Sequence, residues 1–430
     1  MDWVPEGHLA RFILDVVEQL ELTSIFDYYE REQRGYPPHH PQMMVALLLY
    51  AYCVGVPSSR KVEKRCYEDV AFRLLTGNTQ PDHTCISEFR RIHLEGLAAL
   101  FLQVLKLCGK AGLVKLGHVA LDGTKVKANA SKHKAMSYEH MKKKDDELKA
   151  KIAELLRQAE ETDADEDTRF GKDRRGDELP TELARAESRR ARIRELKAEL
   201  EAEAKAQKEA AAKDDSDDDS PPAPTPLPSH QIPTKADGTP TDKAQRNFTD
   251  ADSRIMKTGD GFVQGYNAQA AVDEAHQIIV GQALTNQPPD VEHLLPMLEE
   301  VVANCGRAPD ETSADAGYFS ESNVLGAMER GVDPHIAIGR RKHGEPSPTV
   351  RGRSKKDLTF KELMARKLAT KRGAKIYSRR KVIVEPVFGQ IKNRGFRQFL
   401  LRGLAKVRGE WSLITLSHNL LKLHVAAQTA

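Results

Sequence analysis

The chain has 430 residues, of which 40% are hydrophobic and 30% charged, and this predicts two or three domains with a substantial core. The formal net charge of +3 excludes a chain that is basic throughout but leaves room for a local basic patch. No membrane span or signal peptide is expected, because the longest apolar run, residues 43–56, is too short to cross about 30 Å of hydrocarbon. The five cysteines form no Cys-x-x-Cys pair, so neither a disulfide framework nor a zinc site is expected.

The first 110 residues predict an all-helical domain. Four helices are expected in it, near residues 9–20, 42–55, 58–75 and 85–107. Arg90 and Arg91 fall early in the last of these, behind the turn-like segment Pro81–Thr84. A plain helical bundle is one interpretation. The one we favour is a helix-turn-helix-like module in which Arg90 and Arg91 bind DNA.

A short buried strand is expected at 118–122, ending in Asp122. Residues 132–220 are then dominated by charge, with 21 Lys and Arg against 26 Asp and Glu. Their sparse apolar residues, spaced by three and four, predict two long helices packed as a hairpin. The acidic and proline-rich residues 214–226 predict disorder. We therefore interpret residues 132–245 as a charged helical insertion that shares little core with the rest.

After the insertion the strand pattern resumes. The predicted elements are two strands joined as a hairpin, a helix, a strand, a helix and a strand, at residues 265–272, 277–284, 288–304, 311–317, 320–330 and 335–338. With the strand at 118–122, this is the element order of an RNase H-like fold. The prediction is a mixed α/β (α+β) protein: a helical DNA-binding domain over 1–110, an RNase H-like catalytic domain over 111–131 and 246–430, and the insertion.

Asp122 and Asp315 each end a predicted strand. If the two strands are parallel neighbours, both carboxylates emerge at one edge of the sheet, where ligand sites are common. Close carboxylates repel unless a cation neutralises them, and oxygen ligands favour Mg²⁺ or Mn²⁺. Either aspartate alone could instead be a turn or cap residue.

Glu385 is the third candidate acid. A helix would align it with Tyr377 and Lys381, which precede it by eight and four residues, and with Lys392 two turns later. An ordinary salt-bridged helix surface is the alternative. Glu385 is flanked by valines, however, which is unusual for an exposed surface.

Three segments together resemble the DDE transposases of bacterial insertion sequences. They are Asp122–Lys125, Ser313–Tyr318, and a tyrosine–arginine–glutamate–lysine signature read as Tyr377-(2)-Arg380-(4)-Glu385-(6)-Lys392. The usual signature separates arginine and glutamate by three residues, so either Arg380 or Lys381 takes the arginine's part. The stretches Pro81–His93 and Gly265–Asp273 resemble the helical N-terminal domain and the second strand of the same family.

The resemblance implies that Asp122, Asp315 and Glu385 are catalytic and hold two Mg²⁺ (or Mn²⁺) ions for in-line phosphoryl transfer. The ends of the element would be cut and joined to target DNA, with Tyr377, Lys392 and the arginine equivalent on nearby phosphates. The implied partner is double-stranded DNA, both terminal inverted repeats and target, bound by a homodimer in the bacterial cytoplasm. An RNase H-like nuclease that only hydrolyses nucleic acid, and a non-enzymatic DNA-binding derivative, remain the alternatives.

Residues 340–381 carry 16 Lys and Arg against 3 Asp and Glu. Charge this dense predicts sequence-independent DNA binding, in which Arg379, Arg380 and Lys381 take part and the loop 351–356 becomes ordered.

Four other ionisable residues are not predicted to be catalytic. Asp290 is expected to be a helix N-cap, Asp250 and Asp252 loop residues, and His118 a core or edge histidine.

Overall fold

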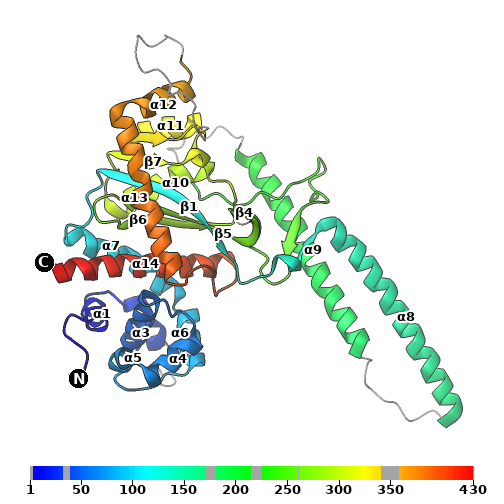
Figure 1. Cartoon of the computed structure of the whole chain (residues 1–430). Helices are drawn as coiled ribbons and strands as arrows, with labels where there is room; N and C mark the ends of the chain where they lie inside the picture. The colour runs from blue at the N-terminus through cyan, green and yellow to red at the C-terminus, as the bar shows by residue number, and fades with distance from the viewer. Residues whose placement is uncertain are drawn as a thin grey trace.

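A computed structural model describes residues 3–31, 39–170, 181–214, 225–259, 261–339 and 358–429. It contains a helical N-terminal part, a mixed sheet with covering helices, and a long helical hairpin (Figure 1). Most of the predicted disordered segment and the predicted loop at 351–356 lie outside the described residues.

The N-terminal part is all-helical, as predicted. Its helices are α1 (Leu9–Glu18), α2 (Thr23–Arg31), α3 (Pro41–Cys53), α4 (Ser59–Glu68), α5 (Val70–Leu75), α6 (His83–Ile92) and α7 (Leu94–Lys110). Asp69 divides the helix predicted over 58–75, because its side chain accepts a hydrogen bond from the Ala71 N–H and caps α5. His93 likewise separates α6 from α7, which are bent by 72°.

No single helix in the described ranges is long and apolar enough to span a bilayer. The α6–α7 pair passes that test only when its two bent parts are taken together.

A mixed six-stranded sheet forms the centre of the molecule. Its strands are β1 (His118–Lys127), β4 (Arg254–Thr258), β5 (Gly261–Asp273), β6 (Ile279–Thr285), β7 (Glu311–Ala314) and β8 (Asp333–Ile336). The order is β4-β5-β1-β7-β8, with β6 also paired to β5. β5 is antiparallel to β1, β4 and β6, whereas β7 is parallel to β1 and β8. The predicted elements of this sheet occur in the predicted order, but the pattern missed β4, and in the N-terminal part it missed α2.

Among the described residues, the helices that lie around this sheet are α10 (Leu294–Cys305), α11 (Glu321–Glu329), α12 (Phe360–Ala369), α13 (Lys371–Asn393) and α14 (Leu404–Thr429). In Figure 1, α13 crosses in front of β1 and β7, while α14 runs below β6 and packs on α7 and α3. One continuous apolar core runs from Ala10 in α1 to Leu423 in α14. The N-terminal helices therefore share their core with the sheet.

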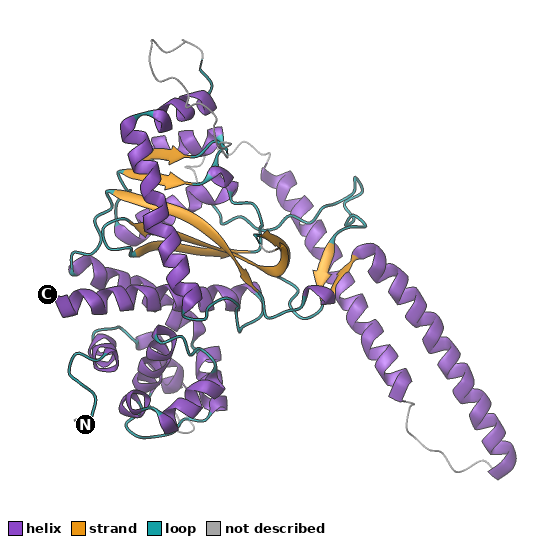
Figure 2. Cartoon of the chain, in the orientation of Figure 1, coloured by secondary structure: helices purple, strands orange, loops and turns teal. Residues whose placement is uncertain are grey.

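The insertion forms a separate arm (Figure 2). It consists of η1 (Lys132–Lys134), β2 (Ala135–Ser137), α8 (Tyr138–Phe170), α9 (Thr181–Asp214) and β3 (Gln245–Asn247). The two long helices pair with each other as predicted, and β2 pairs antiparallel with β3. Its buried apolar residues form two small clusters of their own, one around Met141 and Ile193 and one around Leu200 and Ala204.

Candidate active site

Asp122 and Asp315 lie at the same level of two neighbouring strands. β1 and β7 run parallel with Ala120 opposite Ser313, so each aspartate follows that pair by two residues. Asp315 comes directly after β7. Asp122 does not end its strand, contrary to the prediction, because β1 continues to Lys127 in its pairing with β5. Its carboxylate is at the point where the parallel pairing with β7 stops.

Burial dominates the electrostatics of Asp122. It raises the pKa of the carboxyl to about 6; the Arg380 guanidinium opposes the shift and the neighbouring Asp315 charge adds to it. The Asp122 Oδ2 accepts from Arg380 Nη1 at 2.8 Å, and Oδ1 accepts from the Gly123 N–H at 2.9 Å. Asp122 is therefore a desolvated carboxylate next to a second carboxylate, a situation that a cation stabilises.

Helix α13 packs on β1, and its residues Arg380 and Lys392 contact Asp122 and Thr124 of that strand. Arg380 bridges the two elements, since its Nη2 also lies 3.3 Å from Glu385 Oε1. Lys392 Nζ donates to Thr124 Oγ1 at 2.7 Å, and burial lowers the pKa of this lysine. Lys381 is exposed on the helix. Of the two candidates for the signature's arginine, Arg380 therefore lies at the carboxylates and Lys381 does not.

Asp290 also belongs to this site. It stands at the N-cap position of the 3₁₀ turn Val291–His293, as predicted, and its carbonyl accepts from the His293 N–H at 3.0 Å. Its side chain caps nothing. Instead Oδ1 accepts from Asn267 Nδ2 at 2.7 Å, from Gln269 Nε2 at 2.8 Å and from Lys125 Nζ at 3.0 Å. β6 runs parallel in direction to β1, because both pair antiparallel with β5. The loop after β6 therefore returns to the edge where Asp122 lies, and this alternation of strand directions could have identified Asp290.

Two glycines make room for Asp290 beside the catalytic motifs. A Cβ on Gly123 would lie 2.9 Å from Asp290 Oδ1 and 2.4 Å from Gln269 Nε2. A Cβ on Gly317 would lie 3.0 Å from Asp315 Oδ1 and 3.6 Å from Asp290. The glycines that follow Asp122 and Asp315 thus permit a close approach of polar side chains.

The described residues contain no group of three or more acidic, histidine or cysteine side chains close enough to hold a metal ion. Arg380 occupies the space between Asp122 and Glu385, with its buried Nε lacking a hydrogen-bond partner in the described part of the chain. A cation in this position indicates that the carboxylates need positive charge. The oxygens of Asp122, Asp315 and Glu385 are the donors that Mg²⁺ and Mn²⁺ prefer, so their chemistry suits such an ion, although Arg380 lies between Asp122 and Glu385 in this arrangement.

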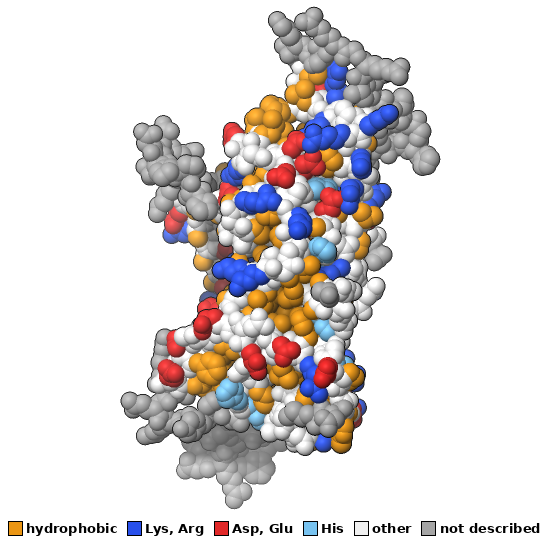
Figure 3. Space-filling view, turned by 90° about the vertical axis from the view of Figure 1, so that its left-hand side faces the viewer, with side chains coloured by type: hydrophobic (Ala, Val, Ile, Leu, Met, Phe, Trp, Pro, Cys, Tyr) orange, Lys and Arg blue, Asp and Glu red, His pale blue; other side chains and the backbone are white. Residues whose placement is uncertain are grey.

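The structure gives different surroundings to the other residues expected to bind DNA. Tyr377 is half-buried one turn before Arg380, whereas Arg379 pairs with Glu274, beyond the end of β5. Lys and Arg side chains, interspersed with Asp and Glu, gather on the upper half of one face of the molecule (Figure 3).

Arg90 is not presented to DNA as expected. It lies in the last turn of α6, is only 6% exposed, and donates to the Pro57 carbonyl at 2.7 Å and to Tyr52 at 3.4 Å. The predicted position within the helix is wrong because α6 ends at Ile92 instead of continuing to residue 107. Arg91 is exposed and pairs with Glu88 on its own helix.

The three remaining residues have structural surroundings. Asp250 is buried and accepts from Tyr266 Oη at 2.8 Å and from the Gly403 N–H at 3.1 Å. Asp252 accepts from the Leu404 N–H. His118 is a buried histidine at the start of the central strand β1, with its ring nitrogens 2.9 Å from Glu274 Oε2 and 2.8 Å from Ser313 Oγ.

Comparison with known families agrees with this geometry. Residues 1–91 match a family described as a transposase domain (DUF772), and residues 226–420 match the transposase DDE domain family. No curated protein and no solved structure matches the chain. The two family matches support a DDE transposase, an enzyme class that acts on DNA and generally uses divalent metal ions.

Proposed function

We propose that this protein is an insertion-sequence transposase that cuts DNA at the ends of its element and joins them to target DNA. The observation that carries the proposal is the convergence of β1, β7 and α13. Asp122 and Asp315 lie at one level of two parallel strands, and α13 brings Arg380 to Asp122 and Glu385. Because these groups come from separate parts of the chain, an ordinary surface salt bridge is a poor explanation of their arrangement.

The catalytic domain is RNase H-like in this proposal. Support comes from the sheet order β6-β5-β1-β7-β8, with three antiparallel strands followed by two parallel ones. The short loops after β6 and β7 place Asp290 and Asp315 at the same edge as Asp122. Loops at this edge commonly carry the functional groups of open α/β sheets.

Asp122, Asp315 and Glu385 hold two divalent ions in the proposed mechanism. Ions held there would supply the positive charge that activates a water or a DNA 3′-hydroxyl and stabilises the leaving oxygen of an in-line phosphoryl transfer. Arg380 exchanges its contact with the carboxylates for the DNA phosphate next to the cut, where its planar guanidinium suits two phosphate oxygens. Lys392, held beside β1 by Thr124, adds positive charge from the other side. Tyr377 contributes a phosphate contact one turn earlier on α13.

Asp290 acts as a positioning residue. Its hydrogen bonds with Asn267, Gln269 and Lys125 fix the polar wall behind Asp122 and Asp315. Negative charge behind the two aspartates also increases the demand for cations at the site. The enzyme would work in the bacterial cytoplasm as a homodimer that brings two DNA ends together.

The decisive experiment uses DNA that carries the inverted repeats flanking the gene. The full chain in Mg²⁺ should cut at the repeat ends and should also join pre-cut ends to a target plasmid. Asp122→Ala, Asp315→Ala and Glu385→Ala should each abolish both products while repeat DNA is still bound. Cutting without joining would show a nuclease, and binding without either product would show a non-enzymatic derivative.

A further inference from the structure

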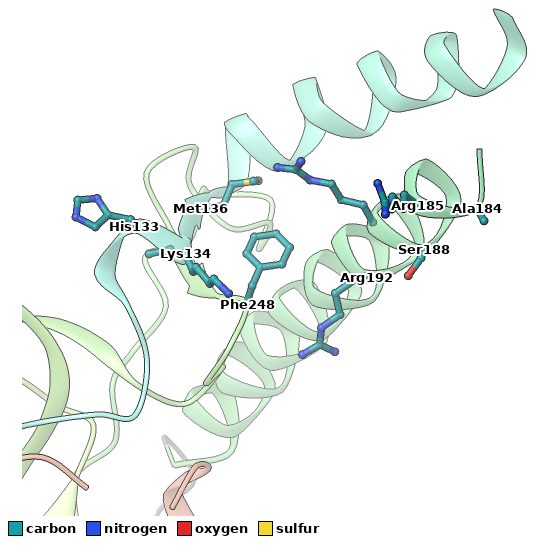
Figure 4. Close-up of a pocket in the computed structure, with 10 residues that line it drawn as sticks. His133, Lys134, Met136, Ala184, Arg185, Ser188, Arg192 and Phe248 are labelled. Carbon is teal, nitrogen blue, oxygen red and sulfur yellow. The ribbon is translucent and has the colours of Figure 1, made fainter. Parts of the chain in front are cut away.

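A cavity of about 660 Å³ lies in the insertion, outside the site formed by the carboxylates (Figure 4). One wall is formed by Lys134 and Met136, from η1 and β2, together with Phe248. The facing wall is the first half of α9, from which Arg185, Arg189 and Arg192 reach the cavity. None of these residues has a role in the proposed mechanism.

The charge of the cavity is the opposite of the charge of its surroundings. Residues 132–220 contain more acids than bases, 26 against 21, yet the described residues that line the cavity include four Lys and Arg side chains and no carboxylate. Arg185, Arg189 and Arg192 are spaced by four and three, so they lie on one face of α9. Charge sorted in this way favours a polyanionic ligand.

Two of the arginines are free to bind it. Within the part of the chain that the structure describes, Arg185 and Arg189 are exposed and have no hydrogen-bond or ion-pair partner. Arg190, between them and Arg192, turns the other way and pairs with Asp145 of α8 at 2.7 Å. A guanidinium offers two parallel donors to phosphate oxygens, and so the unpaired arginines suit phosphodiester groups.

The floor between the cations is apolar and firmly held. Met136 and Phe248 are half-buried against the small core that contains Met141 and Ile193. The Phe248 N–H donates to the Lys134 carbonyl at 3.0 Å, which extends the β2–β3 pairing. A rigid apolar floor with cations on two sides matches a sugar–phosphate backbone, whose deoxyribose faces are apolar and whose phosphates are anionic.

The cavity is also within reach of DNA held at the carboxylates. Lys132 follows Asp122 by ten residues along β1 and the adjoining segment, which span at most ~33 Å. One turn of B-DNA is about 34 Å long. A duplex at the edge that carries Asp122 therefore needs no more than about one further turn to reach the start of the arm.

We propose that this cavity binds the phosphate backbone of duplex DNA flanking the cutting site, independently of base sequence. This inference rests on the proposed function only in naming the DNA as the flank of the cutting site. That the cavity binds a phosphate backbone follows from its own residues. It assigns to the insertion a task in holding DNA.

The test compares two double variants of the full chain. Arg185→Ala/Arg189→Ala removes the free cations, and Arg194→Ala/Lys205→Ala removes two exposed cations of the same helix outside the cavity. Binding constants for repeat DNA and random DNA are measured over a range of salt concentrations. For the cavity variant, the slope of log K against log salt should fall by about 1.8, or ~0.9 for each phosphate that is no longer neutralised. The fall should be the same on both DNAs, and the control should keep the wild-type slope.

A second measurement uses duplexes of increasing length beyond the cut. The wild type should gain affinity when the flank reaches about one turn, and the cavity variant should not. If the cavity variant keeps the wild-type slope of log K against log salt, the proposal is wrong. If that variant also loses self-association, the cavity binds an acidic surface of a second copy of the chain instead of DNA. If these slopes appear in a protein that never cleaves DNA in Mg²⁺, the cavity assignment stands and the proposed function fails.

Discussion

Arg380 and Asp122 are separated by 258 residues of sequence, yet Arg380 Nη1 donates to Asp122 Oδ2 at 2.8 Å. The same guanidinium lies 3.3 Å from Glu385 Oε1. Arg380 thus neutralises two acids of the proposed triad at once. It stabilises an arrangement of carboxylates that would otherwise repel one another.

Substitution of Arg380 and Lys381 separates the two candidates for the signature's arginine. Arg380→Ala should reduce the rate of end cleavage by about 100-fold, since it removes a charged donor aimed at the reacting phosphate. Lys381→Ala should change the rate less than about threefold, because Lys381 is exposed and away from the carboxylates. Single-turnover cleavage of repeat DNA measures both. Equal losses in the two variants would argue against the assignment of Arg380.

Divalent ions should stabilise the protein through the triad. At 100 times its Kd, Mg²⁺ or Mn²⁺ should add about 2.7 kcal/mol to the free energy of unfolding, an effect that EDTA removes. Glu385→Gln should lose most of this gain because one anionic ligand is gone. This gain in stability is measured by thermal unfolding with and without the metal, in the absence of DNA. If the variant is stabilised as much as the wild type, Glu385 is not a ligand.

Asp290→Asn tests the positioning residue. The amide keeps the size of the side chain but loses the charge that pairs with Lys125, so cleavage should fall ~10–100-fold, as is typical for groups behind a metal ligand. DNA binding should be retained. Asp310→Asn, an exposed acid paired with Arg307, is the matched control and should cleave normally. The increase in Tm on metal binding is an independent measurement. It should be smaller in Asp290→Asn than in the wild type and unchanged in Asp310→Asn.

The buried position of Arg90 leads to a prediction on stability. Arg90→Ala should lower the free energy of unfolding by about 1.5–3 kcal/mol, because it removes hydrogen bonds to Pro57 and Tyr52. Arg91→Ala should change it by less than about 0.5 kcal/mol, as expected of an exposed ion pair. Urea denaturation compares the two. A larger effect of Arg91→Ala would contradict the packing of α6.

Glu203 should stabilise the junction between the arm and the sheet. It pairs with Arg246 and lies 3.6 Å from Arg254, and both guanidiniums are buried. Glu203→Ala should therefore lower the free energy of unfolding by about 2 kcal/mol or more. Glu209→Ala, which removes an exposed pair with Lys205, should change it little.

Replacement of residues 140–230 by a Gly/Ser linker should leave the rest of the protein folded, provided that Arg246→Met and Arg254→Met are made as well. Without these two changes the deletion would leave both buried guanidiniums without Glu203. Insoluble protein from that triple change would show that the arm is part of the fold.

Local pattern was enough to predict most elements. The 3.6-residue period and the apolar runs identified the N-terminal helices, the arm and the strands that carry Asp122 and Asp315, because each signal lies within one element. The local pattern failed to predict an element or a helix boundary where the alternation of apolar and polar residues was too short or was hidden within a longer apolar pattern. The break at His93 lies inside an apolar helical pattern, and β4 alternates over only five residues.

The sequence by itself was enough to identify Asp122, Asp315 and Glu385 as candidate site residues and to predict the two-helix arm. Each of these features appears in the sequence as a motif or a charge pattern. Only the tertiary structure placed Arg380, and not Lys381, at the carboxylates, brought Asp290 to the same edge of the sheet as Asp122, buried Arg90, and gathered cations into a cavity of the arm. These features depend on which way a side chain turns and on which distant element faces it. Such long-range contacts arise when α13 packs on β1 and when α9 meets the β2–β3 pair, so no local pattern records them.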